Sequence, residues 1–241
     1  MPDPLAGFVR RHDPDRFLTA LFAPPEKRSA LFALYAFNHE LARAREAVSE
    51  PALALIRLQW WREVVEGANR RHEVATPLRA AIEAGALDSA DLLPIIDARE
   101  MEAEPAIPTL EAWRAYLRGT AGGIAVAAGR LLGAPEPEQL RDPGAAYGAA
   151  GVLRSAPLLA RQGRSLLPFD VLERPNATAR LAAEGLAMAD TRRLTLPRTS
   201  VAAALPVVLA WRDLRRLDVP PGPRGLSDRL AVVLAGMRGR V

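Results

Sequence analysis

Apolar positions recur along most of the chain at the three- and four-residue spacing of amphipathic helices. Between residues 25 and 47, for example, Leu31, Leu34, Tyr35 and Ala42 fall on one face. No run alternates with period two, and aromatic residues make up only 5% of the chain, so strands have little support. The pattern predicts about ten helices, the major ones near 25–47, 51–68, 109–133, 143–162, 177–194 and 199–217.

Helix start signals agree with this pattern. Asp13 followed by Pro14 predicts an N-cap with proline in the first turn. Further start signals are Ser49, Thr76, Asp88, Thr109 and Ser227. The proline-rich breaks at 134–137 and 219–223 are each followed by another periodic segment, as expected of loops between helices. We therefore expect one all-α domain spanning residues 1–241.

Glycine is frequent inside the later helices. "YLRGTAGGIAVAAGRLLG" and "GAAYGAAGVLRSAPLLARQG" keep helical spacing although each interior glycine costs roughly 1 kcal/mol relative to alanine. Close helix–helix approach, or a ligand resting on bare backbone, would compensate that cost. Pro157 is expected to kink the second of these helices.

The amino-acid composition excludes several kinds of functional site. The chain has 241 residues and no cysteine, which excludes disulfides and thiolate sites. His12, His39 and His72 are far apart and lack metal-ligand spacing, so no zinc site is expected. No stretch approaches the roughly 18 apolar residues of a membrane span, and the N-terminus has no signal-peptide core. We expect a cytoplasmic protein, at most peripheral on the inner membrane face.

The charge is uneven along the chain. Residues 1–140 hold 16 basic and 20 acidic side chains, whereas residues 141–241 hold 16 basic and 8 acidic ones. The basic part could face anionic lipid headgroups or an acidic partner, or it could be solvated surface. Lys27 is the only lysine, but the arginines are scattered among core positions, so nucleic-acid binding is not favoured.

Several short motifs, in order, resemble the squalene/phytoene synthase family of all-α head-to-head prenyltransferases. "FALYAF" at 32–37 is similar to the block before that family's first aspartate-rich motif. "YLRGTAGG" at 116–123 is similar to its YxYxVAG block, with Tyr116 kept and Arg118 in place of the second tyrosine. "GVLRSAPLLARQGRSLLP" at 151–168 is similar to the second aspartate motif and the segment after it. The resemblance implies an isoprenoid-synthase-type helical fold around a central cavity.

The family's activity depends on two acidic clusters that face each other and hold Mg²⁺ ions, which draw the diphosphate away from the substrate. This sequence departs from the family at those clusters. The first motif falls on residues 42–46, where Ala42 and Arg43 stand at aspartate positions and Glu46 is the one acidic residue. The metal-side positions of the second motif fall on Gly151, Ser155 and Leu159. We therefore expect no metal site and no Mg²⁺ cofactor.

Residues around the second motif still match the family pattern, namely Arg154, Gly163, Arg164, Leu167 and Pro168. The pattern "AFNHELAR", "VSEP" and "IRLQWW" resembles the branch of the family that contains the mitochondrial complex I assembly factor and its bacterial relatives. That resemblance implies an accessory role in respiratory-complex assembly, at a membrane surface, without an established reaction. Residues expected at the remnant of the pocket are Tyr35, Glu40, Glu50, Arg57, Tyr116, Arg154 and Arg164.

Some assignments stay open at the level of the sequence. Glu40, Arg43 and Glu46 could form an ion-pair cluster in the former metal site or a set of exposed helix-surface pairs. Asp97, Glu100 and Glu104 share a helix face, which predicts a solvated acidic surface, with a relocated metal site as the alternative. Trp60 and Trp61 are adjacent, so at most one of them is expected to point fully into the core.

The favoured function is that of a non-catalytic assembly factor, or a factor that binds an isoprenoid or lipid, for a respiratory membrane complex. The alternative is an active prenyltransferase that uses Glu46, Asp97 and Glu100 as unconventional Mg²⁺ ligands on farnesyl or geranylgeranyl diphosphate.

Overall fold

The computed structural model describes residues 3–48, 50–217, 222 and 224–241. Within these residues the structure is helical apart from its loops and one isolated bridge between Ile107 and Pro168. The prediction of an all-α fold is therefore confirmed. The helices are α1 (Pro4–His12), α2 (Pro14–Ala20), α3 (Arg28–Glu46), α4 (Pro51–Val65), α5 (Ala75–Glu83), α6 (Ser89–Arg99), α7 (Leu110–Leu117), α8 (Gly123–Leu131), α9 (Arg141–Arg161), α10 (Phe169–Leu172), α11 (Ala177–Met188), α12 (Val201–Ala204), α13 (Pro206–Leu214) and α14 (Leu226–Arg238).

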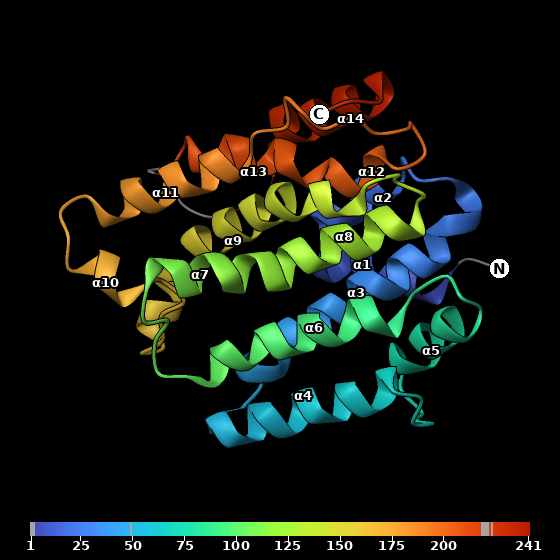
Figure 1. Ribbon diagram of the computed structural model, residues 1–241, viewed down its shortest axis with the longest axis horizontal. Coiled ribbons are helices and arrows are strands. Elements are labelled where there is room, and N and C mark those ends of the chain that lie inside the picture. Colours follow the sequence, from blue (N-terminus) through green and yellow to red (C-terminus); the bar gives the residue numbers. More distant parts are fainter. Residues whose placement is uncertain (1–2, 49, 218–221, 223) are drawn as a thin grey trace.

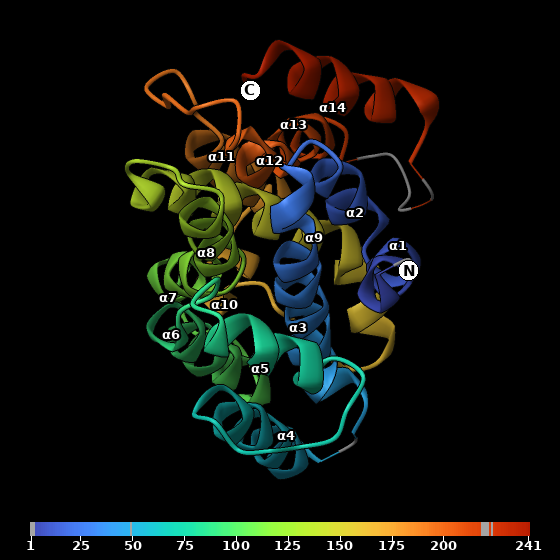
Figure 2. The ribbon, with the colours of Figure 1, turned by 90° about the vertical axis from the view of Figure 1, so that its right-hand side faces the viewer.

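Successive helices form a stack from one end of the molecule to the other. Figure 1 shows α4, α6, α8, α9, α13 and α14 following one another, and each packs against the next. The long helix α3 runs through the middle of the molecule, as Figure 2 shows, and contacts α1, α4, α5 and α8. The second long helix, α9, contacts α8, α11 and α13. The two longest helices thus organise the two main halves of the core.

The apolar face that the sequence predicts on α3 is the centre of one of these halves. Leu31, Leu34, Phe37 and Leu41 are wholly buried there. Burial of each such side chain stabilises the fold by about 1.5–3 kcal/mol. Of the two adjacent tryptophans of α4, only Trp61 is buried, whereas Trp60 is partly covered. This agrees with the prediction that at most one of them points fully into the core.

Three of the predicted helix starts are confirmed by their capping hydrogen bonds. The side chains of Asp13, Asp88 and Thr109 accept from the backbone N–H of Arg16 (3.0 Å), Ala90 (2.9 Å) and Ala112 (3.1 Å), respectively.

Two other predicted starts are wrong by one or two residues. The helices α5 and α14 begin before Thr76 and Ser227, which lie inside the first turn. The predicted cap at Ser49 lies outside the described residues, and α4 begins at Pro51.

Predicted helix lengths were less accurate. A π-helical turn, Arg118–Gly122, interrupts the helix expected over 109–133. The helix expected over 177–194 ends at Met188, and the one over 199–217 is divided into α12 and α13 at Leu205, directly before Pro206. A proline cannot donate the backbone hydrogen bond that would continue the first of these two helices.

Several glycines of the later helices lie where a neighbouring helix approaches closely. A Cβ added at Gly122 would lie 2.6 Å from the carbonyl oxygen of Arg141, and one at Gly144 would lie 2.5 Å from the Cβ of Ala125. Close helix–helix approach is thus confirmed at these positions. Gly151 differs, since a Cβ there would meet no atom within 4 Å.

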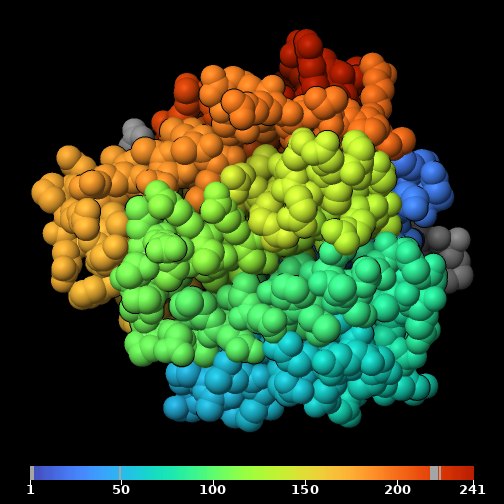
Figure 3. All heavy atoms as spheres, in the orientation of Figure 1, coloured from blue at the N-terminus to red at the C-terminus, as the bar shows by residue number. Residues whose placement is uncertain are grey.

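No helix of the described part of the chain combines the length and the apolar character that crossing a bilayer requires. The space-filling view in Figure 3 shows the helices closely packed over this face, with α14, in dark red, standing out from the body of the molecule.

Candidate functional site

A cavity of about 230 Å³ lies between α3 and α9. Its walls also include residues of α2, α6, α7, the π turn and the segment after α9. The residues that line it are Arg16, Asn38, Ala42, Glu46, Arg99, Glu102, Tyr116, Leu117, Thr120, Ala121, Tyr147, Gly148, Gly151, Val152, Ser155, Leu159, Arg164 and Leu166.

The first motif contributes two of its positions to this cavity. Ala42 and Glu46 lie one turn apart on α3 and share its cavity face. Arg43 is exposed and does not line the cavity, although its charge acts on the neighbouring Glu46. Glu40 is buried, with 7% of its surface exposed, and also lies outside the cavity.

The sequence left two arrangements open for Glu40, Arg43 and Glu46: an ion-pair cluster or exposed helix-surface pairs. Neither is present, because no ion pair among the described residues joins the three and Glu40 is buried. Steps of three residues turn successive side chains by about 60° around the helix. The three side chains therefore point in different directions, rather than sharing the face that the sequence suggested.

The second motif contributes all three of its metal-side positions. Gly151, Ser155 and Leu159 follow one another at four-residue intervals along α9 and line the cavity opposite α3. The hydroxyl of Ser155 donates to the carbonyl oxygen of Val152 at 3.1 Å. The structure thus brings the two degenerate motifs together across one cavity.

A buried polar network fills the floor of the cavity. Glu102 Oε1 accepts hydrogen bonds from the Tyr116 hydroxyl (2.7 Å) and from the guanidinium of Arg99 (2.5 Å). Arg99 also donates to Asn38 Oδ1 at 3.1 Å, while its Nε is buried without a partner. Burial and the neighbouring Glu102 carboxylate raise the pKa of Tyr116 well above its usual value. Burial alone would lower the pKa of Arg99, but the combined effect of Glu102 and Tyr116 raises it above its usual value.

Glu46 is the second carboxylate of the cavity. Partial burial, followed by the negative charge of Glu102, raises its pKa, while Arg164, Arg99 and Arg43 oppose the shift. The carboxylate form of Glu46 is therefore disfavoured relative to a solvated glutamate.

Arg16 closes the inner end of the cavity. Its guanidinium pairs with Asp13 at 2.9 Å and lies 5.6 Å from the ring centre of Tyr35 and 4.9 Å from that of Tyr147. Burial raises the pKa of Tyr35 to about 12. Tyr35 lies in a narrow adjoining crevice, beside the cavity rather than on its wall.

Of the other predicted pocket residues, Tyr116 and Arg164 line the cavity. Arg57 and Glu50 are exposed and lie apart from it, because α4 turns Ala54, Leu58 and Trp61 toward the core instead. Arg154 lies apart from it too. It precedes Ser155 by one residue, which rotates it about 100° away from the cavity face, and it pairs with Asp213 at 3.3 Å.

The acidic residues proposed as an alternative metal site lie outside the cavity. Asp97 and Glu100 are exposed and both pair with Arg62, at 2.6 and 3.0 Å. They do not line the cavity. The residue of this segment that does is Glu102, because the 3₁₀ turn Glu100–Ala103 ends α6 and rotates it inward. No motif in the sequence indicates that turn, and nothing distinguishes Arg99 from the many other arginines of the chain.

The residues of the cavity do not fit a cluster of Mg²⁺ ions. Mg²⁺ requires several oxygen ligands in octahedral arrangement. The cavity offers two carboxylates, and an arginine and a tyrosine already occupy one of them. Across residues 3–48, 50–217, 222 and 224–241, no three His, Asp or Glu side chains gather closely enough to hold a metal ion.

Comparison with known proteins agrees with the resemblance that the sequence motifs indicate. The chain is 30% identical over 171 residues to the human protein named NADH dehydrogenase (ubiquinone) complex I, assembly factor 6, and 31% identical to its bovine counterpart. Each alignment covers 68% of this chain and 51% of the relative, so the chain spans about half the length of these relatives.

Solved structures show the same fold. A dehydrosqualene synthase crystallised in complex with a ligand aligns with a TM-score of 0.78 at 13% identity, over 97% of this chain and 94% of the other. The squalene synthase HpnC from Alicyclobacillus acidocaldarius aligns with a TM-score of 0.64 at 15% identity, over 98% and 92%. The predicted isoprenoid-synthase-type fold is confirmed. Together with a squalene/phytoene synthase family model that matches residues 9–205, these findings establish that the chain belongs to the squalene/phytoene synthase family.

Proposed function

We propose that this protein is a non-catalytic member of its family that serves as an accessory factor in the assembly of a respiratory membrane complex. The observation that carries the proposal is the facing pair of helix surfaces on α3 and α9. At the cavity they present Ala42 and Glu46 on one side and Gly151, Ser155 and Leu159 on the other, so Glu46 is the one carboxylate at these motif positions.

The chemistry of the cavity supports this reading. Ionisation of an allylic diphosphate needs cations that neutralise the leaving group as it departs. Here Arg99 and Tyr116 are bound to Glu102, and Arg16 is bound to Asp13. Two of the three arginines that line the cavity, Arg16 and Arg99, are thus each paired with a carboxylate of the protein itself, and Arg164 is the third.

The small size of the cavity also supports a non-catalytic function. Small-molecule sites in proteins usually enclose roughly 300–1,000 Å³, whereas this cavity encloses about 230 Å³. We propose that any isoprenoid or lipid tail bound here enters as a short segment, held by apolar residues such as Leu159 and Leu166. Such binding would serve recognition rather than turnover.

The relatives supply the biological setting. Two mammalian relatives carry the name of a complex I assembly factor. We infer a corresponding role for this chain, with a membrane-bound respiratory complex as its partner and no nucleic acid. The inferred location is the membrane surface on the inner side.

The rival function is an active prenyltransferase with unconventional metal ligands. Glu46 favours it, as a carboxylate kept at the cavity. Asp97 and Glu100 weigh against it, because both are paired with Arg62 outside the cavity.

Deletion of the gene in its own host tests the assembly role. We expect the assembled NADH dehydrogenase complex to decrease on native gels, while hopanoid and carotenoid levels stay unchanged. Plasmid-borne wild-type protein should restore assembly, as should an Ala42→Ser variant that leaves the cavity without a carboxylate at that position. Normal assembly with altered isoprenoid products would contradict the proposal and favour the rival.

A further inference from the structure

The C-terminal helix α14 is joined to the rest of the molecule along one side only. Figures 1 and 2 show it lying across the outer end of the stack, against α13. Its inward face buries Val232 completely, and Gly236 lies against the ring of Phe22. Asp228 ties this face down through ion pairs with Arg212 (2.5 Å) and Arg216 (3.3 Å).

The opposite face of α14 is also apolar. Leu226, Leu230, Leu234 and Met237 are 78%, 58%, 48% and 68% exposed. Spacings of four, four and three residues place them within about 80° of one another around the helix axis. A surface helix normally carries polar residues on its outer side. These four side chains, here called the α14 stripe, therefore form a surface that no other described part of the protein covers.

The charges around the α14 stripe are positive. Arg229 and Arg238 are exposed and flank the stripe on its two sides, and Arg240 follows the helix. The ion pairs among the described residues include none of these three arginines. The one acidic residue of α14, Asp228, is only 15% exposed and faces inward. An apolar stripe between cations complements a surface that is apolar inside and anionic outside.

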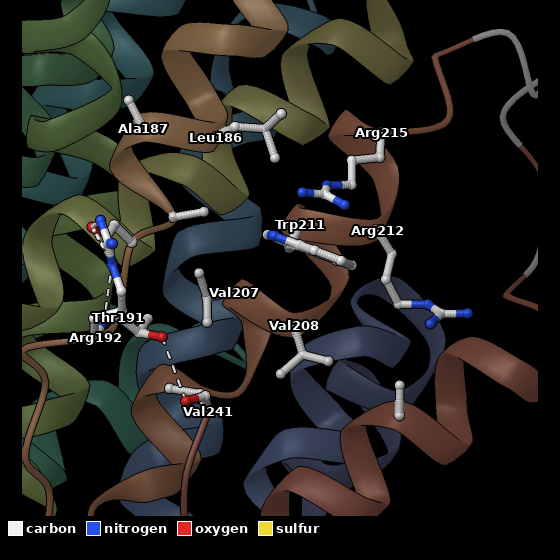
Figure 4. Close-up of a pocket in the computed structure, with 13 residues that line it drawn as sticks. Leu186, Ala187, Thr191, Arg192, Val207, Val208, Trp211, Arg212, Arg215 and Val241 are labelled. Carbon is white, nitrogen blue, oxygen red and sulfur yellow. Dashed lines mark hydrogen bonds and ion pairs between the residues drawn. The ribbon is translucent and has the colours of Figure 1, made fainter.

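A groove lies beside α14, which contributes Ala231 to its wall. A cavity of about 850 Å³ lies between α11, α13 and α14, with Val207, Val208 and Leu186 on its walls (Figure 4). Trp211 is 45% exposed at this cavity, and the guanidinium of Arg215 lies 3.8 Å from its ring centre. Tryptophan and arginine side chains of this kind favour the boundary between lipid headgroups and acyl chains.

We propose that the α14 stripe, together with Trp211, docks this protein onto an anionic phospholipid surface. The helix lies parallel to the bilayer with its four apolar side chains among the acyl chains, while Arg229 and Arg238 contact lipid phosphates. A protein partner with acidic groups is the competing occupant. Lipid is favoured because the apolar stripe is continuous along the whole helix and is bordered by cations on both sides. This inference concerns a surface separate from the α3–α9 cavity and does not depend on the proposed function.

Vesicle flotation with the full chain tests the docking surface. Wild-type protein should float with vesicles of phosphatidylcholine and phosphatidylglycerol and stay behind with phosphatidylcholine alone, and high salt should release it. Arg229→Gln combined with Arg238→Gln should weaken binding about 30-fold, since each arginine near an anionic surface contributes roughly fivefold. Leu230→Gln combined with Leu234→Gln should weaken it by about tenfold or more, through loss of apolar burial.

The matched control is Ile56→Gln, which removes another exposed apolar side chain, 64% exposed on α4, far along the chain from α14. It should bind as the wild type does. Because all of these substitutions are at exposed positions, circular dichroism should show folded helical protein in each case. Three results would overturn the proposal: no flotation of folded wild-type protein, equal flotation of all variants, or a leucine variant that abolishes self-association of the protein and leaves vesicle binding intact.

Discussion

The hydroxyl of Tyr116 and the guanidinium of Arg99 donate to the same oxygen of Glu102, inside the cavity where the two degenerate motifs meet. Glu102 is 7% exposed and Tyr116 is 5% exposed. A buried carboxylate in this setting is a structural element whose charge balances that of Arg99. The hydrogen bonds and the ion pair inside this cavity therefore contribute to the stability of the fold.

Replacement of Glu102 should therefore destabilise the protein strongly. Glu102→Gln leaves the Arg99 guanidinium buried without its anion, and we expect a loss of about 3–5 kcal/mol in the free energy of unfolding. Tyr116→Phe removes one hydrogen bond and should cost about 1–2 kcal/mol. Urea denaturation measures both. The exposed Glu138→Gln serves as the control, and wild-type stability in Glu102→Gln would contradict the structural role of the network.

Acid should destabilise the protein through His39. Burial, the nearby His12 and the charge of Arg43 lower the pKa of this imidazole from 6.5 to about 4, while Asp13 opposes the shift. Its Nε2 is buried without a partner, and its ring stacks on His12 at 4.6 Å. Between pH 6.5 and 4 the unfolded chain takes up a proton at this residue and the folded chain does not, so stability falls as the pH falls through that window.

The size of this effect should be about 1–2 kcal/mol, allowing for screening by solvent. Urea midpoints of wild type and His39→Gln, compared from pH 7 to pH 4, measure it. The variant should lose the part of the pH dependence that His39 contributes. An identical slope in the two proteins would show that His39 protonates as readily in the folded state as in the unfolded chain.

Arg224 should hold the two ends of the chain together. It is 9% exposed at its side chain and pairs with Asp15 of α2 (2.8 Å) and with Asp213 of α13 (2.5 Å). Arg224→Ala leaves both carboxylates without this cation, so we expect a loss of about 2–4 kcal/mol and faster hydrogen exchange in α14. Arg192→Ala removes an arginine that is 88% exposed and pairs with Asp190, and its melting temperature should match the wild type. Equal melting temperatures for both variants would contradict this role.

The glycines of α9 should respond to alanine in opposite directions. At Gly144 a methyl group would collide with Ala125 and with the backbone of the π turn, so Gly144→Ala should cost about 1–3 kcal/mol. At Gly151 it would meet open cavity, and the gain in helix propensity should stabilise the protein by roughly 0.5–1 kcal/mol. Thermal denaturation of the two variants gives the comparison. Similar destabilisation by both would indicate that Gly151 is packed.

The long helices were predictable from apolar periodicity. The meeting of the two motif regions was predictable only from the resemblance to the squalene/phytoene synthase family. The direction in which individual side chains point was harder to predict from the sequence. Arg154 was expected at the pocket, but it lies one residue from the cavity face and binds Asp213 instead. In a continuous helix Glu102 would lie off the face shared by Asp97 and Glu100, but a 3₁₀ turn brings it into the cavity. Such short turns depend on tertiary packing, which periodicity does not encode.

The exposure of the α14 stripe was also not predictable from apolar spacing. Apolar spacing in "LSDRLAVVLAGMR" predicts a helix, but both faces of that helix are apolar. The packing of α14 against α13 and the region of α2 determines which face is buried and which is left on the surface.

Diphosphate release tests the central claim most directly. Purified protein, shown by circular dichroism to be helical, is incubated with farnesyl and geranylgeranyl diphosphate, with and without Mg²⁺. We predict no release above the protein-free reaction in either condition. Release over multiple turnovers that requires Mg²⁺ and is abolished by Glu46→Gln would contradict the account and establish an active prenyltransferase.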